Sequence, residues 1–135
     1  MDRLKERLGD ARRAVLTLHD ILREPPSVIV RDAAIKRFEY TFEAVWKAAQ
    51  LYLTNEGLDV ASPRGAVRTS VQAGLFAPEQ AEEALAMVDD RNLTVHLYKE
   101  AVALQIFERI PRHAGLLSDW LDAIESRYSK TSNSA

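Results

Sequence analysis

The sequence predicts an all-α protein that folds as an up-and-down bundle of four or five helices. Apolar residues recur at intervals of three and four along much of the chain, which is the spacing of one face of a helix. The 135 residues include only five glycines and five prolines, and no segment combines strand-like alternation with hairpin turn residues. We therefore expect one helical domain over residues 1–128, followed by a polar, disordered tail at 129–135.

The first helix is predicted from about Asp2 to Glu24, because Pro25-Pro26 cannot donate the N–H groups that would continue it. Ser27 is expected to cap a long second helix that closes at Gly57. The residues expected in the core share the three-and-four spacing. They are Leu4, Leu8, Ala11, Val15, Leu18 and Leu22 in the first helix, and Ile35, Phe38, Phe42, Val45, Ala49 and Tyr52 in the second.

The second helix carries a thinner apolar stripe on the side opposite its core face. The members are Ala33, Tyr40, Ala44 and Leu51, which fall within about 40° of one another at 100° per residue. Scattered apolar residues are common on protein surfaces, and they explain the stripe without any partner. The other interpretation is a contact with a second protein, either another copy of the chain or a different partner.

Three further helices are predicted from the residues that typically begin and end helices. Ser62-Pro63 has the pattern of an N-cap and a first-turn proline, which opens a short helix that stops at Gly74. Pro78 is expected to open the next one, and Pro111 to kink or divide a last helix over about 99–128. The expected apolar faces are Ala81, Leu85 and Val88 in the fourth helix, and Leu117, Leu121, Ile124 and Tyr128 in the last.

Several classes of site are excluded by composition. The chain has no cysteine, which removes disulfides, thiolate zinc sites and cysteine nucleophiles. The three histidines, His19, His96 and His113, lack metal-ligand spacing, and Glu39 and Glu43 lack the Glu-x-x-His partners of a di-iron bundle. We therefore expect no metal and no cofactor, and we interpret the two glutamates as a solvated or salt-bridged face.

Charge and hydropathy indicate a cytoplasmic protein. No run of 18 apolar residues exists and the first residues contain no apolar signal region, so no membrane association is expected. The net charge of −2 argues against general coating of nucleic acid. Residues 78–90 carry five acidic side chains and no basic one, so any polyanion would need a local site.

Residues 89–98 concentrate the groups that could carry chemistry. In an unbroken helix Arg91 and His96 would point about 140° apart, while Arg91 and Tyr98 would align to within about 20°. Convergence on one ligand therefore requires the helix to end between Arg91 and His96, or a second copy of the chain to supply one of them. The run at 93–95, with two β-branched residues, is where we expect such a break.

Two interpretations of this segment follow from spacing alone. In the first, Arg91 pairs with Asp89 or Asp90 and His96 is a buried, hydrogen-bonded histidine. In the second, the guanidinium grips phosphate oxygens while the imidazole removes the proton of an RNA 2′-hydroxyl. Attack by that oxygen gives a cyclic phosphate without a metal, and Arg91 stabilises the charge that builds on phosphorus. DNA lacks this nucleophile and should not react.

The run Arg91-Asn92-Leu93-Thr94-Val95-His96-Leu97-Tyr98 resembles the Arg-x(4–6)-His signature of HEPN domains, followed by the tyrosine of their HepT-like branch. The segment Lys36–Lys47, then Ser62-Pro63-Arg64, then Ala73-Gly74-Leu75 resembles the nucleotidyltransferase substrate-binding proteins. These are HEPN-fold partners of minimal nucleotidyltransferases (MNT). The resemblance covers about residues 28–128 in collinear blocks.

The resemblance implies a HEPN-like bundle that forms a homodimer, in which two Arg–His motifs face a shared cleft. It also implies a toxin–antitoxin pair, in which the HEPN protein is a metal-independent ribonuclease that an MNT partner silences. Some MNT partners transfer AMP onto the tyrosine that corresponds to Tyr98. On this basis His96 is the expected general base, Arg91 the phosphate clamp and Asn92 the group that orients the phosphate.

Two other functions remain open at this stage. The bundle could be a non-catalytic nucleotide- or substrate-binding subunit of a two-component nucleotidyltransferase, with phosphate bound but not cleaved. It could also be a structural helical dimer in which the motif is only an ion pair. The apolar stripe on the second helix is the expected partner contact, either with a second copy or with the MNT protein.

Overall fold

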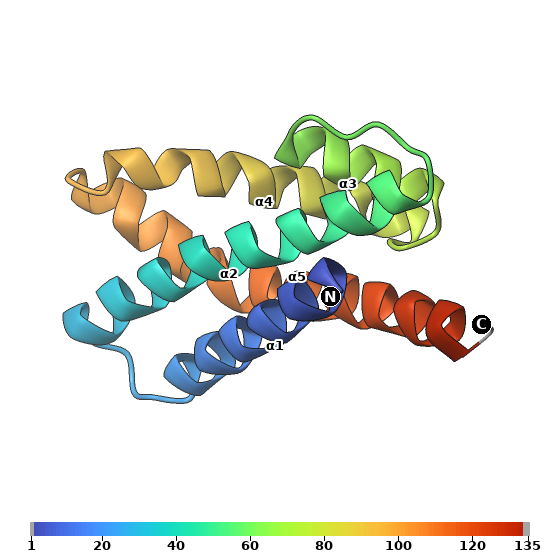
Figure 1. Cartoon of the computed structure of the whole chain (residues 1–135). Helices are drawn as coiled ribbons and strands as arrows, with labels where there is room; N and C mark the ends of the chain where they lie inside the picture. Colours follow the sequence, from blue (N-terminus) through green and yellow to red (C-terminus); the bar gives the residue numbers. More distant parts are fainter. Residues whose placement is uncertain (1, 134–135) are drawn as a thin grey trace.

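The computed structural model describes residues 2–133, which form an all-α bundle (Figure 1). Five α-helices and two short 3-10 helices account for the ordered elements of this range. They are α1 (Arg3–Leu22), α2 (Val28–Asn55), α3 (Pro63–Gln72), η1 (Pro78–Gln80), α4 (Ala81–Leu93), η2 (Thr94–His96) and α5 (Glu100–Asn133). The predicted fold class is therefore confirmed. Within this range, none of the helices is both long enough and apolar enough to cross a membrane.

The helix starts follow the predicted caps. The Ser27 hydroxyl accepts a hydrogen bond from the Val30 amide at 3.0 Å, and the Ser62 hydroxyl accepts one from the Gly65 amide at 3.0 Å. Two glycines with positive φ follow α2 and α3, Gly57 at 88° and Gly74 at 79°. These caps set the lengths of α2 and α3 and hence where the chain turns back.

The core lies where α1, α2 and α5 meet, and it extends between α3 and α4. All the apolar residues predicted for the core face of α2 are buried. Trp120 of α5 is fully buried, packs against Phe76 with ring centroids 5.0 Å apart, and donates its indole N–H to the Ser70 hydroxyl at 2.9 Å. Because this bond satisfies the one polar atom of the indole, the largest side chain of the core is accommodated without an unpaired donor.

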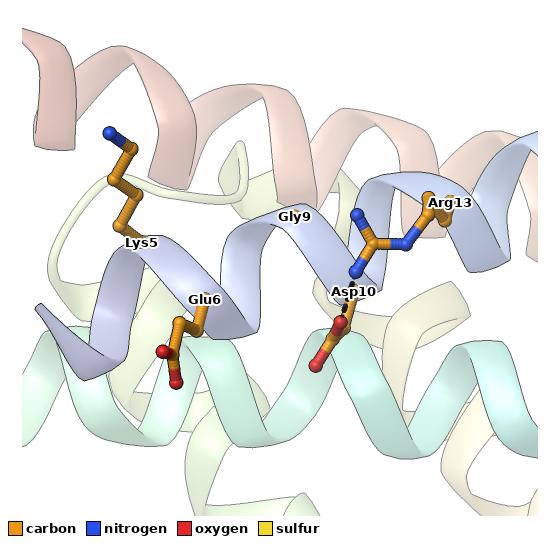
Figure 2. Close-up of a pocket in the computed structure, with 5 residues that line it drawn as sticks. All are labelled: Lys5, Glu6, Gly9, Asp10 and Arg13. Carbon is orange, nitrogen blue, oxygen red and sulfur yellow. Dashed lines mark hydrogen bonds and ion pairs between the residues drawn. The ribbon is translucent and has the colours of Figure 1, made fainter.

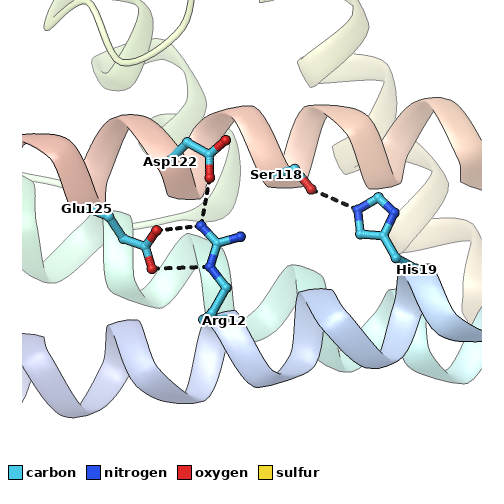
Figure 3. A network of polar contacts seen from close by, with 5 residues as sticks. All are labelled: Arg12, His19, Ser118, Asp122 and Glu125. Carbon is cyan, nitrogen blue, oxygen red and sulfur yellow. Dashed lines mark hydrogen bonds and ion pairs between the residues drawn. The ribbon is translucent and has the colours of Figure 1, made fainter.

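Polar contacts join α1 to α5 along one edge of the bundle (Figure 3). The Arg12 guanidinium donates to both carboxylate oxygens of Glu125, through Nε at 3.2 Å and through Nη2, and to Asp122 at 2.6 Å. His19 and the Ser118 hydroxyl lie 2.8 Å apart two turns further along. These contacts hold the first and last helices side by side.

Two details differ from the sequence expectations, the buried face of α4 and the end of α5. The buried face of α4 contains Ala84, Met87 and Val88, whereas Ala81 and Leu85 are only half-buried, because α4 packs against both α3 and α5. Of the two outcomes expected at Pro111, a kink or a division, the division does not occur: α5 runs through Pro111 as one helix and changes direction along its course (Figure 1). It continues to Asn133, so the residues expected in a tail remain helical as far as the structure describes them.

Candidate functional site at the α4–α5 corner

The chain turns from α4 into α5 through the residues that carry the predicted motif. Helix α4 ends at Leu93, η2 takes Thr94–His96, and α5 begins at Glu100. At the helix end the Arg91 carbonyl accepts two hydrogen bonds from Thr94, one from its backbone N–H and one from its hydroxyl at 2.7 Å. The predicted break between Arg91 and His96 is thus confirmed, and the 140° separation of a continuous helix does not apply.

Arg91 is oriented by α2 and by its own helix end. Its Nη1 donates to the Thr94 hydroxyl at 3.1 Å, and its Nη2 lies 3.7 Å from a carboxylate oxygen of Glu43. The Nε atom is buried without a hydrogen-bond partner among the described residues. The side chain is 26 % exposed, so the guanidinium is held in place and still meets solvent.

The partners proposed for Arg91 in the ion-pair interpretation are wrong. Asp89 pairs with Arg64 of α3, and Asp90 is buried and pairs with Arg109 of α5. Glu43 takes their place, and the proximity of residues 43 and 91 follows from the crossing of α2 and α4, which local spacing does not reveal. The Glu43 carboxylate also accepts from the Trp46 indole at 3.3 Å and lies 3.6 Å from the Lys47 ammonium. A salt-bridged face is confirmed for Glu43.

His96 and Tyr98 lie on the solvent side of the corner. His96 is exposed, so the expectation of a buried histidine is wrong, and Tyr98 is 78 % exposed. The His96 Nδ1 atom lies 3.3 Å from the Tyr98 hydroxyl, and the two rings meet edge to face at 5.9 Å. Asn92 is exposed on the last turn of α4. Within one subunit, Arg91 and His96 form no hydrogen bond with each other among residues 2–133.

A buried network fixes the last turn of α4 behind the motif. Asp90 is 5 % exposed and accepts two hydrogen bonds from Arg109, at 2.7 and 2.8 Å, and one from His113 Nε2 at 2.6 Å. The His113 ring stacks on Phe38 with centroids 5.3 Å apart. Since Asp90 directly precedes Arg91, this network determines the direction in which the guanidinium leaves the helix.

Burial and hydrogen bonding set the charges of this network. Burial lowers the pKa of His113, although Asp90 acts in the opposite direction. For Asp90, burial acts to raise the pKa, but hydrogen bonds from Arg109 and His113 hold the pKa below its ordinary value. The buried Nδ1 atom of His113 has no partner among the described residues, which fits a neutral ring protonated on Nε2.

The acidic segment 78–90 is largely neutralised where it approaches the motif. Besides the pairs of Asp89 and Asp90, Glu83 lies 3.9 Å from a guanidinium nitrogen of Arg112. Asp90 is also turned into the protein. The negative charge of this segment therefore does not dominate the surface around Arg91.

A groove opens beside Tyr98, between α2 and the start of α5. Its volume is ≈ 490 Å³. Its lining residues are Arg31, Asp32, Ile35, Lys36, Glu39, Leu97, Tyr98 and Ala103. Sequence reasoning missed this groove, because residues 31–39 and 97–103 meet only through the packing of α2 on α5.

The apolar stripe of α2 is partly covered by the subunit itself. Ala44 and Leu51 pack against the core, and the Tyr40 hydroxyl lies 2.6 Å from that of Thr17 in α1. Ala33 is half-buried. A contact through this stripe stays a prediction, with Tyr40 as its most exposed member.

Another hollow, of ≈ 500 Å³, lies on α1 and is lined by Lys5, Glu6, Gly9, Asp10 and Arg13 (Figure 2). All five residues come from a single helix, and Arg13 pairs with Asp10. None of them belongs to the predicted site. Substitutions on this surface are therefore suitable controls for substitutions at the α4–α5 corner.

The family model described as nucleotidyltransferase substrate binding protein like matches residues 6–126. Among solved structures, a protein from Thermus thermophilus is 51% identical over 84% of this chain and 98% of that one, with a TM-score of 0.79. Comparison with curated proteins finds no match.

Two more distant structures share the fold. The tri-AMPylated HEPN toxin of Shewanella oneidensis, in complex with an MNT antitoxin, is 17% identical over 93% of this chain and 99% of that one, with a TM-score of 0.74. A mutant of the MntA–HpeT toxin–antitoxin is 16% identical over 93% of this chain and 99% of that one, with a TM-score of 0.76. At these identities the likeness concerns the fold.

Proposed function

The chain belongs to the nucleotidyltransferase substrate-binding protein-like family, and we propose that it is the HEPN toxin of an MNT–HEPN pair, an endoribonuclease that works without a metal. The observation that carries the proposal is the corner at 91–98, where an oriented guanidinium, an exposed imidazole and an exposed phenol follow one another across a helix break. The fold shared with a HEPN toxin supports it.

In the proposed reaction, His96 removes the proton of a ribose 2′-hydroxyl, and that oxygen bonds to the adjacent phosphorus. The bond from phosphorus to the 5′-oxygen breaks, and the leaving oxygen takes a proton from water. The products are a 2′,3′-cyclic phosphate and a 5′-hydroxyl. Arg91 stabilises the negative charge on the phosphoryl oxygens, and Asn92 orients them by hydrogen bonding.

The proposal includes a homodimer with two motifs facing one cleft. Arg91 and His96 have different neighbours within one subunit, so a second copy is a simple way to place both on one phosphate. We also propose that the MNT partner silences the toxin, through AMP on Tyr98 or by covering the site. In the covalent route the Tyr98 oxygen bonds to the α-phosphorus of ATP, and pyrophosphate leaves. The phenolic proton passes to a base, and the candidate is His96, whose Nδ1 atom lies 3.3 Å from the Tyr98 oxygen.

Cleavage of RNA in the presence of a chelator tests the nuclease. We expect His96→Ala and Arg91→Ala each to slow cleavage by roughly 10²–10⁴-fold, because each removes a group that acts in the transition state. His19→Ala and Arg13→Ala are the matched controls, since both lie on α1, and they should retain full activity. The same two site variants should relieve the growth arrest caused by the parent.

Equal cleavage or equal toxicity of all four variants and the parent would refute the catalytic assignment. The second candidate, a non-catalytic nucleotide- or substrate-binding subunit, is favoured by the groove beside Tyr98. It predicts that calorimetry detects binding of a nucleotide and of the nucleotidyltransferase partner, while purified RNA stays intact. Intact mass after co-expression with that partner tests for AMP on Tyr98.

A further inference from the structure

The groove beside Tyr98 has the composition of a site for a small, partly aromatic ligand. Ile35 and Ala103 are buried and Leu97 is half-buried, so these three give it an apolar floor. Tyr98 stands at its edge with most of its ring exposed. A volume of ≈ 490 Å³ lies within the range of about 300–1,000 Å³ that is usual for small-molecule sites.

Two charged side chains in the groove are available to a ligand. Lys36 and Glu39 line it one turn apart on α2, and neither forms an ion pair or side-chain hydrogen bond with another described residue. Arg31, in contrast, is buried and already neutralised by Asp32 and Glu100. The free cation in the groove is therefore that of Lys36, and Glu39 adds a free hydrogen-bond acceptor.

A third cation stands at the open edge. The Lys99 ammonium lies 5.9 Å from the centroid of the Tyr98 ring, and the His96 ring meets the Tyr98 ring edge to face. A phosphate near Tyr98 would thus meet positive charge from the groove and from the rim, while a flat base could lie on the apolar floor against the phenol ring.

From this arrangement we propose that the groove is a binding subsite for one nucleoside monophosphate. The base stacks against Tyr98 over Ile35 and Leu97, Lys36 pairs with the phosphate, and Glu39 accepts from the ribose hydroxyls. The inference rests on the proposed function only for the source of the nucleotide. That source is either a residue of the RNA next to the cleaved bond or the adenylyl group carried by Tyr98 itself.

Titration of the isolated protein with AMP, followed by heteronuclear NMR, tests the subsite without any cleavage. We expect amide shifts confined to residues 31–39 and 96–103. Lys36→Glu should weaken AMP binding about tenfold or more, because an attractive charge becomes repulsive. Lys5→Glu makes the same charge change on the distant surface of α1 (Figure 2) and should leave AMP binding unchanged.

Three outcomes would overturn the subsite: no shifts at millimolar AMP, shifts outside those two segments, or identical shifts with inorganic phosphate alone. Lys36 is exposed, so its replacement is not expected to unfold the chain, and Tyr98→Leu gives a second variant that should weaken AMP binding through lost stacking. Equal AMP affinity of both variants and the parent would also reject the assignment.

Two further arms separate the sources of the nucleotide and separate this inference from the nuclease. If a 2′-deoxy oligonucleotide displaces AMP, the subsite belongs to the path of the RNA. If the oligonucleotide does not displace AMP, but free AMP no longer binds once AMP is attached to Tyr98, the subsite holds the attached adenylyl group. If the protein binds AMP but does not cleave RNA, the subsite proposal stands and the nuclease proposal is refuted. If the protein cleaves RNA but does not bind AMP, the nuclease proposal stands and the subsite proposal is refuted.

Discussion

Glu43 is the residue that most directly limits the charge of Arg91. Its carboxylate lies 3.7 Å from the guanidinium and would stand close to any phosphate bound there. Removing that negative charge should therefore favour an anion. We expect Glu43→Gln to tighten binding of a non-cleavable 2′-deoxy oligonucleotide several-fold at low salt, with an effect that fades as salt screens the charges.

Fluorescence anisotropy at two salt concentrations measures this effect. Glu6→Gln removes the same charge on the surface of α1 and should change little (Figure 2). Thermal stability should change little in Glu43→Gln, because partly exposed ion pairs contribute about 0–1 kcal/mol. Weaker binding in Glu43→Gln would mean that the pair serves to orient Arg91 and does not compete with phosphate.

His113 makes the stability of the fold depend on pH. Its pKa is lowered from 6.5 by burial, so below pH 6.5 the unfolded chain binds more protons than the folded one. The free energy of unfolding should therefore decrease as the pH falls from 6.5 towards the lowered pKa. In His113→Gln, which can still donate to Asp90 but cannot be protonated, this slope should be smaller than in the parent.

Urea unfolding at a series of pH values measures the slope. His19→Gln is the matched control for replacing a histidine by glutamine, because His19 contacts Ser118 at the partly exposed edge between α1 and α5 (Figure 3). If His113→Gln lost stability with falling pH as steeply as the parent, the titration of another group would have to be responsible.

At the scale of elements, two glycines with open surroundings should respond in opposite ways to alanine. Gly57 has a φ of +88° after α2, and Gly115 lies inside α5, and a Cβ added at either would meet nothing within 4 Å. Gly57→Ala should lower the free energy of unfolding by about 1–2 kcal/mol through backbone strain. Gly115→Ala should raise it by about 0.5–1 kcal/mol through helix propensity. Denaturant unfolding measures both, and a shift of the same sign in both variants would contradict this explanation.

The helices, their caps and the break at 93–95 could be predicted because each depends on residues a few positions apart. Ser27 and Ser62, for example, bond to amides three residues later. The contact of Glu43 with Arg91 could not be predicted in this way, and neither could the contact of the buried Asp90 with His113. Both depend on how α2, α4 and α5 cross. The groove at Tyr98 was missed for the same reason.

At the scale of the whole molecule, assembly is the property to test. The stripe of α2 is half-covered by the subunit, but Tyr40 and Ala44 still line a hollow of ≈ 250 Å³ between α1 and α2. We expect Ala44→Glu to reduce self-association or binding of the proposed MNT partner without unfolding the chain. Ala86→Glu on the exposed side of α4 is the matched control. If light scattering gives the same masses for both variants as for the parent, alone and with the partner, the contact does not involve this stripe.

Positions 90 and 91 face opposite environments, one inside the protein and one towards α2 and solvent. Successive helical residues are 100° apart, so deleting one residue earlier in α4 would turn the arginine towards the place where the carboxylate now meets His113. The length of α4 is consequently restricted. Segment 56–62 lies outside any helix, and a gained or lost residue there shifts no such register. Across related chains, insertions and deletions should gather in that connection and be rare in α4.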